Sequence, residues 1–157
     1  MDEILRRAKA ESKESAYHLI MQMWMYENGY HKFYIARTAD TNELCFVQSI
    51  IYPEDIIKAK GRFKHKFPKM KEGEAIIESS YTFEKFRGNR LHPAITTDML
   101  RFCKRQGLKR MLAYVNKDNI VSIKGFERAG YTRFEEVSKY KILSYIRWEI
   151  RKNKKVS

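Results

Sequence analysis

The sequence predicts an α/β (α+β) fold in which helices flank a mixed, mostly antiparallel central sheet, built as one domain over residues 1–157. Two observations carry this prediction. Apolar runs at residues 75–83 and 109–115 are separated by a helical pattern, and such a strand–helix–strand unit places its strands parallel. Residues 32–39 and 43–51 are strand-like and flank a short polar turn, which predicts an antiparallel hairpin.

The chain begins with a helical region. Residues 2–27 have apolar side chains at three- and four-residue spacing. Residues 12–15 interrupt this pattern, so one helix and two helices both remain open. The Asn28-Gly29 pair ends the region. After the hairpin, Pro53 is suited to start a short helix.

A cationic turn at residues 86–93 leads directly into a helix predicted over residues 93–106. Backbone N–H groups at a helix start lack intrahelical partners, and the macrodipole favours an anion there. Pro93 is expected at the first helical position, and Gly107 is expected to end the helix. The turn is therefore a candidate anion-binding site.

Further helical and strand patterns follow the strand at residues 109–115. Asp118 or Asn119 is expected to cap a helix that ends at Gly130. Residues 131–138 are interpreted as a strand. Residues 140–151 alternate apolar and charged side chains, which predicts a final strand with one buried face.

Alternation also assigns the side chains of strand 75–83 to two faces. It places Glu78 and Thr82 on one face and Tyr81 and Phe83 on the other.

The composition indicates a folded, basic protein with 43% hydrophobic residues and a net charge of +13. Residues 58–71 carry lysines and arginines with no acidic residue in the segment until Glu72. This cluster is either solvated surface or a region that attracts polyanions, nucleic acid included.

Other features exclude several classes. No apolar run approaches the ~20 residues of a membrane span, and the N-terminus lacks the order of a signal peptide, so a cytoplasmic protein is expected. Cys45 and Cys103 lie in apolar patterns and are expected to be reduced core residues, with a disulfide as the alternative. His18, His31 and His65 lack metal-ligand spacing, so no metal site is expected.

Four segments, in this order and spacing, resemble the signature of the GNAT superfamily of acyl-CoA-dependent acetyltransferases: Arg87-Gly88-Asn89-Arg90-Leu91-His92, Lys104-Arg105-Gln106-Gly107-Leu108, Asn116-Lys117-Asp118-Asn119 and Phe126-Glu127-Arg128-Ala129-Gly130-Tyr131. The resemblance covers roughly residues 75–138. It implies acetyl-CoA as cosubstrate and a parallel strand pair that splays apart to admit it. The reaction implied is direct attack of an amine, or less often a hydroxyl, of a small or sugar-like acceptor on the thioester.

The resemblance also implies site residues. Glu78 is the expected general base, directly or through water, and Tyr81 is the reserve catalytic residue, as base or as proton donor to the thiolate. A backbone N–H near Thr82 or Phe83 is expected to face the thioester oxygen. His92 is either the cap before Pro93 or a further reserve. The residues expected to bind the cofactor are Thr82, Phe83, Arg87, Gly88, Asn89, Arg90, Leu91, His92, Asn119 and Ser122.

The chain departs from the family pattern at three positions. Arg90 and His92 stand where the family usually has glycine or alanine, and Phe126 stands where many members have a proton-donating tyrosine. These departures motivate a second hypothesis, a catalytically weak protein that binds an acyl-CoA or a protein partner. A basic nucleic-acid-binding module is the third. A homodimer is possible under each.

Overall fold

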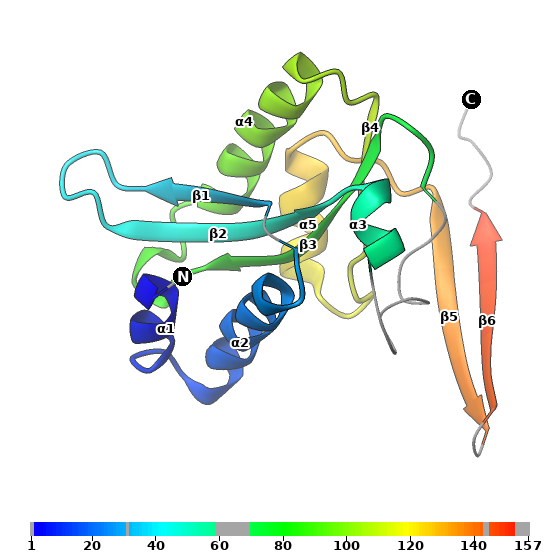
Figure 1. Ribbon diagram of the computed structural model, residues 1–157, viewed down its shortest axis with the longest axis horizontal. Helices are drawn as coiled ribbons and strands as arrows, with labels where there is room; N and C mark the ends of the chain where they lie inside the picture. The colour runs from blue at the N-terminus through cyan, green and yellow to red at the C-terminus, as the bar shows by residue number, and fades with distance from the viewer. Residues whose placement is uncertain (1, 31, 59–69, 143–144, 153–157) are drawn as a thin grey trace.

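The computed structural model describes residues 2–30, 32–58, 70–142 and 145–152, and its main sheet has the strand order β1-β2-β3-β4 (Figure 1). β1 and β3 pair antiparallel with β2, whereas β4 pairs parallel with β3. β5 and β6 form a separate antiparallel pair. The predicted fold class, with its mixed sheet and flanking helices, is confirmed. The elements are α1 (Asp2–Ala8), α2 (Lys13–Glu27), β1 (Phe33–Arg37), β2 (Leu44–Ile51), α3 (Pro53–Lys58), β3 (Glu74–Thr82), η2 (Glu84–Phe86), α4 (Leu91–Arg105), β4 (Arg110–Ala113), α5 (Ile120–Arg128), β5 (Glu135–Ile142) and β6 (Tyr145–Lys152).

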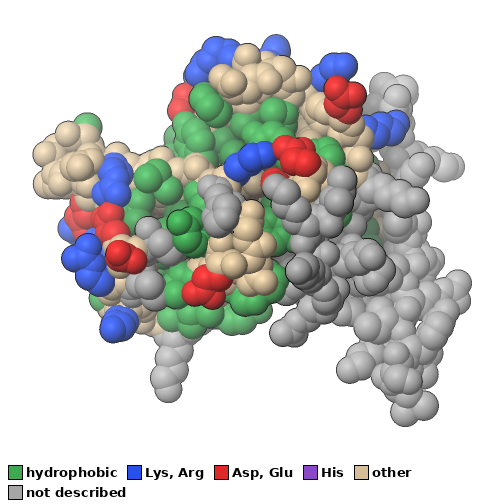
Figure 2. All heavy atoms as spheres, in the orientation of Figure 1, with side chains coloured by type: hydrophobic (Ala, Val, Ile, Leu, Met, Phe, Trp, Pro, Cys, Tyr) green, Lys and Arg blue, Asp and Glu red, His purple; other side chains and the backbone are tan. Residues whose placement is uncertain are grey.

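The N-terminal region forms two helices. Ser12 ends the interruption between them and caps α2, because its Oγ accepts a hydrogen bond from the Ser15 N–H at 3.3 Å. α2 is apolar on more than one side: Leu19 and Met25 are buried, while Tyr17 is 62% and Ile20 is 55% exposed. Figure 2 shows hydrophobic side chains over much of the surface in this region.

The sheet is covered on both faces, with α1 and α2 on one side and α4 on the other (Figure 1). On the α1–α2 side, Ile76 packs with Met25 of α2. On the other side, Ile77 packs with Met99 of α4 and Phe126 of α5. Burial on both faces explains why β2 has no exposed residue.

β3 contains a bulge that overturns the predicted assignment of faces. Val47 pairs with Tyr81, but Ser49 pairs with Glu78, so β3 has one residue more than β2 in this interval. Ser79 lies in the left-handed region with φ 54°. Because an inserted residue reverses the alternation that follows, Tyr81 packs on the α1–α2 side with Leu19. Glu78 and Tyr81 therefore share a face, and the predicted separation was wrong.

The start of α4 also differs from the prediction. The helix begins at Leu91 with Arg90 as its N-cap, so Pro93 is the third helical residue and not the first. Proline is tolerated there because N–H groups of the first turn need no helical partner.

The last strands have shifted boundaries. β5 starts at Glu135, later than the predicted residue 131, and the alternating stretch 140–151 is divided between β5 and β6. The chain reverses between Ile142 and Tyr145, and periodicity alone does not reveal a reversal inside an alternating stretch. The buried face predicted for residues 140–151 lies outside the described side chains.

Cys45 and Cys103 are buried and free, as expected. Within the described ranges, no helix is long and apolar enough to cross a membrane, and no group of His, Cys, Asp and Glu could hold a metal ion. Most of the basic cluster at residues 58–71 lies outside the described residues, and so do His31 and His65.

Candidate active site

The two parallel strands separate at their carboxyl ends. β4 pairs with β3 only along residues 74–77, opposite residues 110–113, although β3 continues to Thr82. From Glu78 onward, the edge of β3 opposite β2 therefore has no hydrogen-bonded neighbour from β4. The separation provides the splayed strand pair that the sequence resemblance implied, and the bulge at Ser79 lies at its beginning.

The backbone N–H of Thr82 points into this separation, whereas that of Phe83 does not. Phe83 donates its N–H to the Cys45 carbonyl at 3.2 Å, so these two residues form a hydrogen-bonded pair. Hydrogen-bonded and non-hydrogen-bonded pairs alternate in an antiparallel ladder. Thr82, which pairs with Phe46, must therefore turn its N–H away from β2. Of the two predicted oxyanion donors, only Thr82 has suitable geometry.

The turn before α4 presents its backbone outward. Gly88 and Arg90 are both left-handed, with φ of +81° and +55°. No hydrogen bond within the described part of the chain is donated by the N–H groups of residues 88–92. Since they lie at and just before the N-terminal end of α4, these groups are suited to an anion. A left-handed non-glycine residue costs about 1–2 kcal/mol, so Arg90 is strained.

Arg87 points away from the turn and back toward the N-terminal helices. Its Nε donates to the Thr82 carbonyl at 3.1 Å, and its Nη2 donates to Ser15 Oγ at 2.9 Å and to the Tyr81 hydroxyl at 3.1 Å. Glu84 lies 3.6 Å from Nη1 as an ion pair. The guanidinium predicted to bind phosphate thus connects the end of β3 to the start of α2.

Tyr81 belongs to the same network. Its hydroxyl donates to the Glu11 carboxylate, whose Oε2 also accepts the Glu84 N–H at 3.2 Å. Burial raises the pKa of Tyr81 to about 12, and the hydrogen bond to Glu11 is the second-largest cause. Because this hydroxyl already donates to Glu11, that hydrogen bond would have to break before Tyr81 could protonate a departing thiolate.

Glu78 lies half-buried on the α1–α2 side of β3, immediately before the bulge. Its cross-strand neighbour Ser49 donates its hydroxyl to Gln22 Oε1 at 2.5 Å. Gln22, a fully buried residue of α2, donates its Nε2 to the carbonyl of Ser79. The bulge is therefore held by a side chain from another element.

The opposite face supplies a second polar contact next to the bulge. Ser80 donates its hydroxyl to Gln48 Oε1 at 2.7 Å, and Gln48 Nε2 lies 2.7 Å from Met99 Sδ. Sequence reasoning did not identify Gln22 or Gln48. The signal that points to both is an uncharged polar residue within an otherwise apolar helix or strand, since a buried amide needs partners.

His92 turns into the protein. Its ring packs between α4 and α5, edge-on to Phe126 with centroids 4.7 Å apart. The prediction that His92 caps the helix was wrong, because Arg90 is the N-cap and no side chain caps this helix. Burial lowers the pKa of His92.

Asn119 caps α5. Its Oδ1 accepts the Ser122 N–H at 3.0 Å, which confirms one of the two predicted caps. Both residues are positioned by this contact, and Asn119 keeps its amide Nδ2 as a donor.

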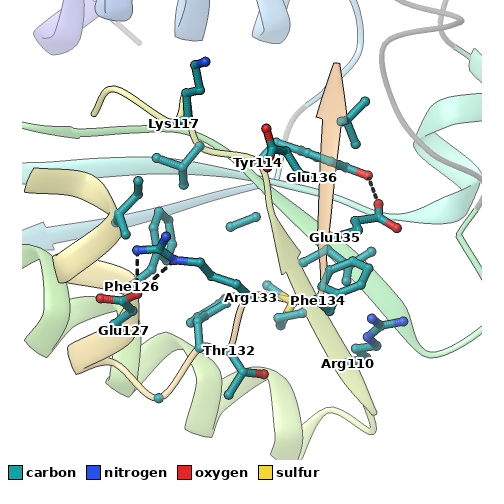
Figure 3. A pocket seen from close by; sticks show the side chains of 18 of the residues that line it. Arg110, Tyr114, Lys117, Phe126, Glu127, Thr132, Arg133, Phe134, Glu135 and Glu136 are labelled. Atoms are coloured by element: carbon teal, nitrogen blue, oxygen red, sulfur yellow. Dashed lines mark hydrogen bonds and ion pairs between the residues drawn. The ribbon is translucent and has the colours of Figure 1, made fainter. Parts of the chain in front are cut away.

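A cavity of about 620 Å³ lies between β4, α5 and β5 (Figure 3). Tyr114 donates its hydroxyl to Glu135 at 2.9 Å beside it, and Arg133 donates to Glu127 at 3.0 Å. None of the predicted site residues lines this cavity. The candidate site is therefore placed at the separated strands and the turn before α4, where the predicted residues lie.

Comparisons with known proteins bear on the family and the fold. Residues 3–131 match the Acetyltransferase (GNAT) family, whereas no curated protein matches the sequence. Among solved structures, the aminoglycoside antibiotic 6'-N-acetyltransferase AAC(6')-IG from Acinetobacter haemolyticus is similar with a TM-score of 0.56 and 10% identity, over 90% of this chain and 90% of that chain. YycN from Bacillus subtilis, provisionally assigned as an acetyltransferase, is similar with a TM-score of 0.54 and 17% identity, over 91% of this chain and 85% of that chain.

At these identities the structural likeness concerns the fold alone, whereas the family match extends over most of the chain. The chain therefore belongs to the GNAT family of acetyltransferases, acyl-CoA-dependent transferases that use acetyl-CoA as their cosubstrate.

Proposed function

We propose that this protein transfers an acetyl group from acetyl-CoA to an amine of a small or sugar-like acceptor, with a hydroxyl acceptor as the alternative. The observation that carries the proposal is the separation of β3 from β4 beside a turn whose N–H groups donate to no acceptor in the described chain. The similar solved structure named for an aminoglycoside N-acetyltransferase supports an amine on a sugar-like molecule.

The turn before α4 is proposed to bind the phosphates of the cosubstrate. The N–H groups of residues 88–92 supply the hydrogen bonds, and the exposed Arg90 guanidinium adds positive charge. Arg87 contributes only if it leaves its contacts with Ser15 and Tyr81. The Nδ2 of Asn119, with Ser122 beside it, is proposed to contact the pantetheine arm.

The Thr82 N–H is proposed to stabilise the oxygen of the tetrahedral intermediate. A donor fixed in a strand is already oriented, which is why such groups lower the barrier for attack on a carbonyl. Phe83 supports this position through the core and not through its N–H, which donates to Cys45.

Glu78 is proposed to accept the proton of the attacking amine, directly or through water. The amine nitrogen bonds to the thioester carbon, the carbon–sulfur bond then breaks, and the CoA thiolate leaves with the electron pair. Phe126 has no proton to offer and the Tyr81 hydroxyl already donates to Glu11, so the thiolate takes its proton from solvent, at the site or after release.

Thermal unfolding with acetyl-CoA, followed by thiol release on a panel of amines, tests this function. A ligand that binds only the folded state raises the melting temperature, and turnover releases free CoA. We expect both, with the highest rate on amino sugars. Absence of a thermal shift, together with salt-sensitive oligonucleotide binding, would instead indicate nucleic-acid binding.

A second candidate function is acyl-CoA binding with little turnover. It is favoured by Phe126, which cannot donate a proton, and by the engagement of Arg87 in contacts with the protein itself. Stabilisation by acetyl-CoA without thiol release on any acceptor would support this candidate over the enzyme.

A further inference from the structure

His92 fills a slot between the start of α4 and the middle of α5. Its ring meets the Phe126 ring at 89°, and its centroid lies 6.1 Å from that of Phe46 on β2. A Cβ added at Gly125 would lie 2.4 Å from His92 Nδ1 and 3.0 Å from its Cε1. Real Cβ atoms do not approach other atoms to 2.4 Å, so the ring fits only because residue 125 is glycine.

The turn that precedes His92 lacks the usual support of a helix start. Its N-cap, Arg90, makes no side-chain capping bond, and the first turn of α4 contains no acidic residue. Arg90 is also strained, because it is left-handed. Residues 87–90 are exposed, whereas His92 is largely covered. Packing of the His92 ring against α5 therefore attaches this first turn to the neighbouring helix.

We propose that His92 is a positioning residue for the cosubstrate. By packing against Gly125 and Phe126, the ring holds the first turn of α4 in place and thereby orients the N–H groups of residues 88–92. His92 acts through the main chain and does not touch the reacting atoms. The inference rests on the proposed function, because it is the acyl-CoA phosphates that this turn would bind.

The contribution of the ring is its shape and not its charge. Its Nε2 is buried and makes no hydrogen bond within the described residues. Burial lowers the pKa of the imidazole, which keeps it neutral near pH 7. His92 and Gly125 thus form a matched pair: the large side chain on α4 fits only because residue 125 on α5 has no side chain.

A double-mutant cycle tests the proposal by calorimetric titration of acetyl-CoA into wild type, His92→Ala, Gly125→Ala and the double variant. Each single change is expected to raise Kd about tenfold. A rise of this size corresponds to a turn that adopts its binding conformation about one-tenth of the time. The double variant should also bind about tenfold more weakly, and not about a hundredfold, because both changes remove one and the same contact.

Steady-state kinetics provide a readout that loss of stability alone would not produce. The KM for acetyl-CoA should rise in all three variants while kcat at saturating acetyl-CoA stays near the wild-type value, because no reacting group is changed. Val121→Ala is the matched control, since residue 121 lies on the same helix and is 85% exposed. It should leave Kd unchanged.

The outcomes separate this inference from the proposed function. If wild type and both single variants bind acetyl-CoA equally well, the positioning role is overturned and the proposed function stands. A hundredfold loss in the double variant would show two independent effects and would overturn the pairing. If wild type takes up no acetyl-CoA, the proposed function fails and the inference fails with it.

Discussion

Two left-handed residues that are not glycine flank the proposed site, and the protein holds them by different means. Ser79 in β3 is half-buried, and the fully buried side chain of Gln22 donates a hydrogen bond to its carbonyl. Arg90 before α4 is exposed and has no capping bond, and two residues later the ring of His92 packs against α5. The contact at Ser79 is thus a hydrogen bond from a buried side chain, whereas the contact near Arg90 is ring packing between α4 and α5.

The difference suits the role proposed for each position. The bulge places Glu78 and the Thr82 N–H, where catalysis requires a geometry that does not change. The turn is proposed to receive a large, charged cosubstrate, and its N–H groups at residues 88–92 donate to no acceptor in the described chain. The comparison predicts that damage near Ser79 affects the chemical step, whereas damage near Arg90 affects binding.

The largest effect is expected for Glu78→Gln. Loss of a general base lowers the rate typically by about 10²–10⁴-fold, so kcat should fall by that order. The acetyl-CoA Kd should not change, because Glu78 lies on β3 and not on the turn. Stopped-assay rates and titration calorimetry measure the two quantities. A variant with wild-type kcat would remove Glu78 as the base.

Gln22→Leu should destabilise the protein by about 3 kcal/mol, because the Ser79 carbonyl and the Ser49 hydroxyl would both lose a buried partner. Urea unfolding measures the change. Gln48→Leu is the matched comparison, since Gln48 contacts Ser80 and Met99 side chains and not the backbone of the bulge. Equal losses in the two variants would contradict a special role for Gln22.

The free energy of unfolding should fall with decreasing pH in a way that depends on His92. Its pKa is lowered in the folded state, so the unfolded chain binds a proton first as the pH drops. Stability from this residue is therefore complete above the ordinary histidine pKa of about 6.5 and is lost as the pH falls toward the folded value, at most about 1.4 kcal/mol per pH unit.

His92→Ala provides the comparison for that titration, because the other histidines remain in the variant. The difference in unfolding free energy between wild type and variant should shrink from pH 7.5 to pH 5, measured by urea unfolding. A constant difference would show that the ring is not buried in its neutral form.

The smallest effects are expected for Arg90→Gly and Ser79→Gly. Glycine adopts positive φ freely, but it also has more freedom to lose on folding, so each change should alter stability by no more than about 1 kcal/mol. Thermal unfolding measures both. Arg90→Gly should also weaken acetyl-CoA binding if its guanidinium contacts phosphate, whereas Ser79→Gly should leave binding unchanged.

Local patterns predicted much of this molecule. The hairpin, the parallel strand pair and the Asn119 cap were predicted from spacing and from capping residues, and the family was predicted from the order of four segments. The face of Tyr81 was not predicted, because the bulge depends on Gln22, which lies 57 residues from Ser79 in the chain. The positions of the Arg87 and His92 side chains were not predicted either, because their partners are also distant in the chain. Arg87 bonds Ser15, and His92 packs against Gly125 and Phe126.

The class of fold, the family and the position of a basic turn at a helix start follow from the amino-acid sequence, since each depends on periodicity and neighbouring residue types. Which side chains face the separated strands, which N–H groups remain available and which cation is already engaged follow from the packing of the elements. Those outcomes depend on contacts between elements distant in the chain, and one bulge reverses every side chain after it.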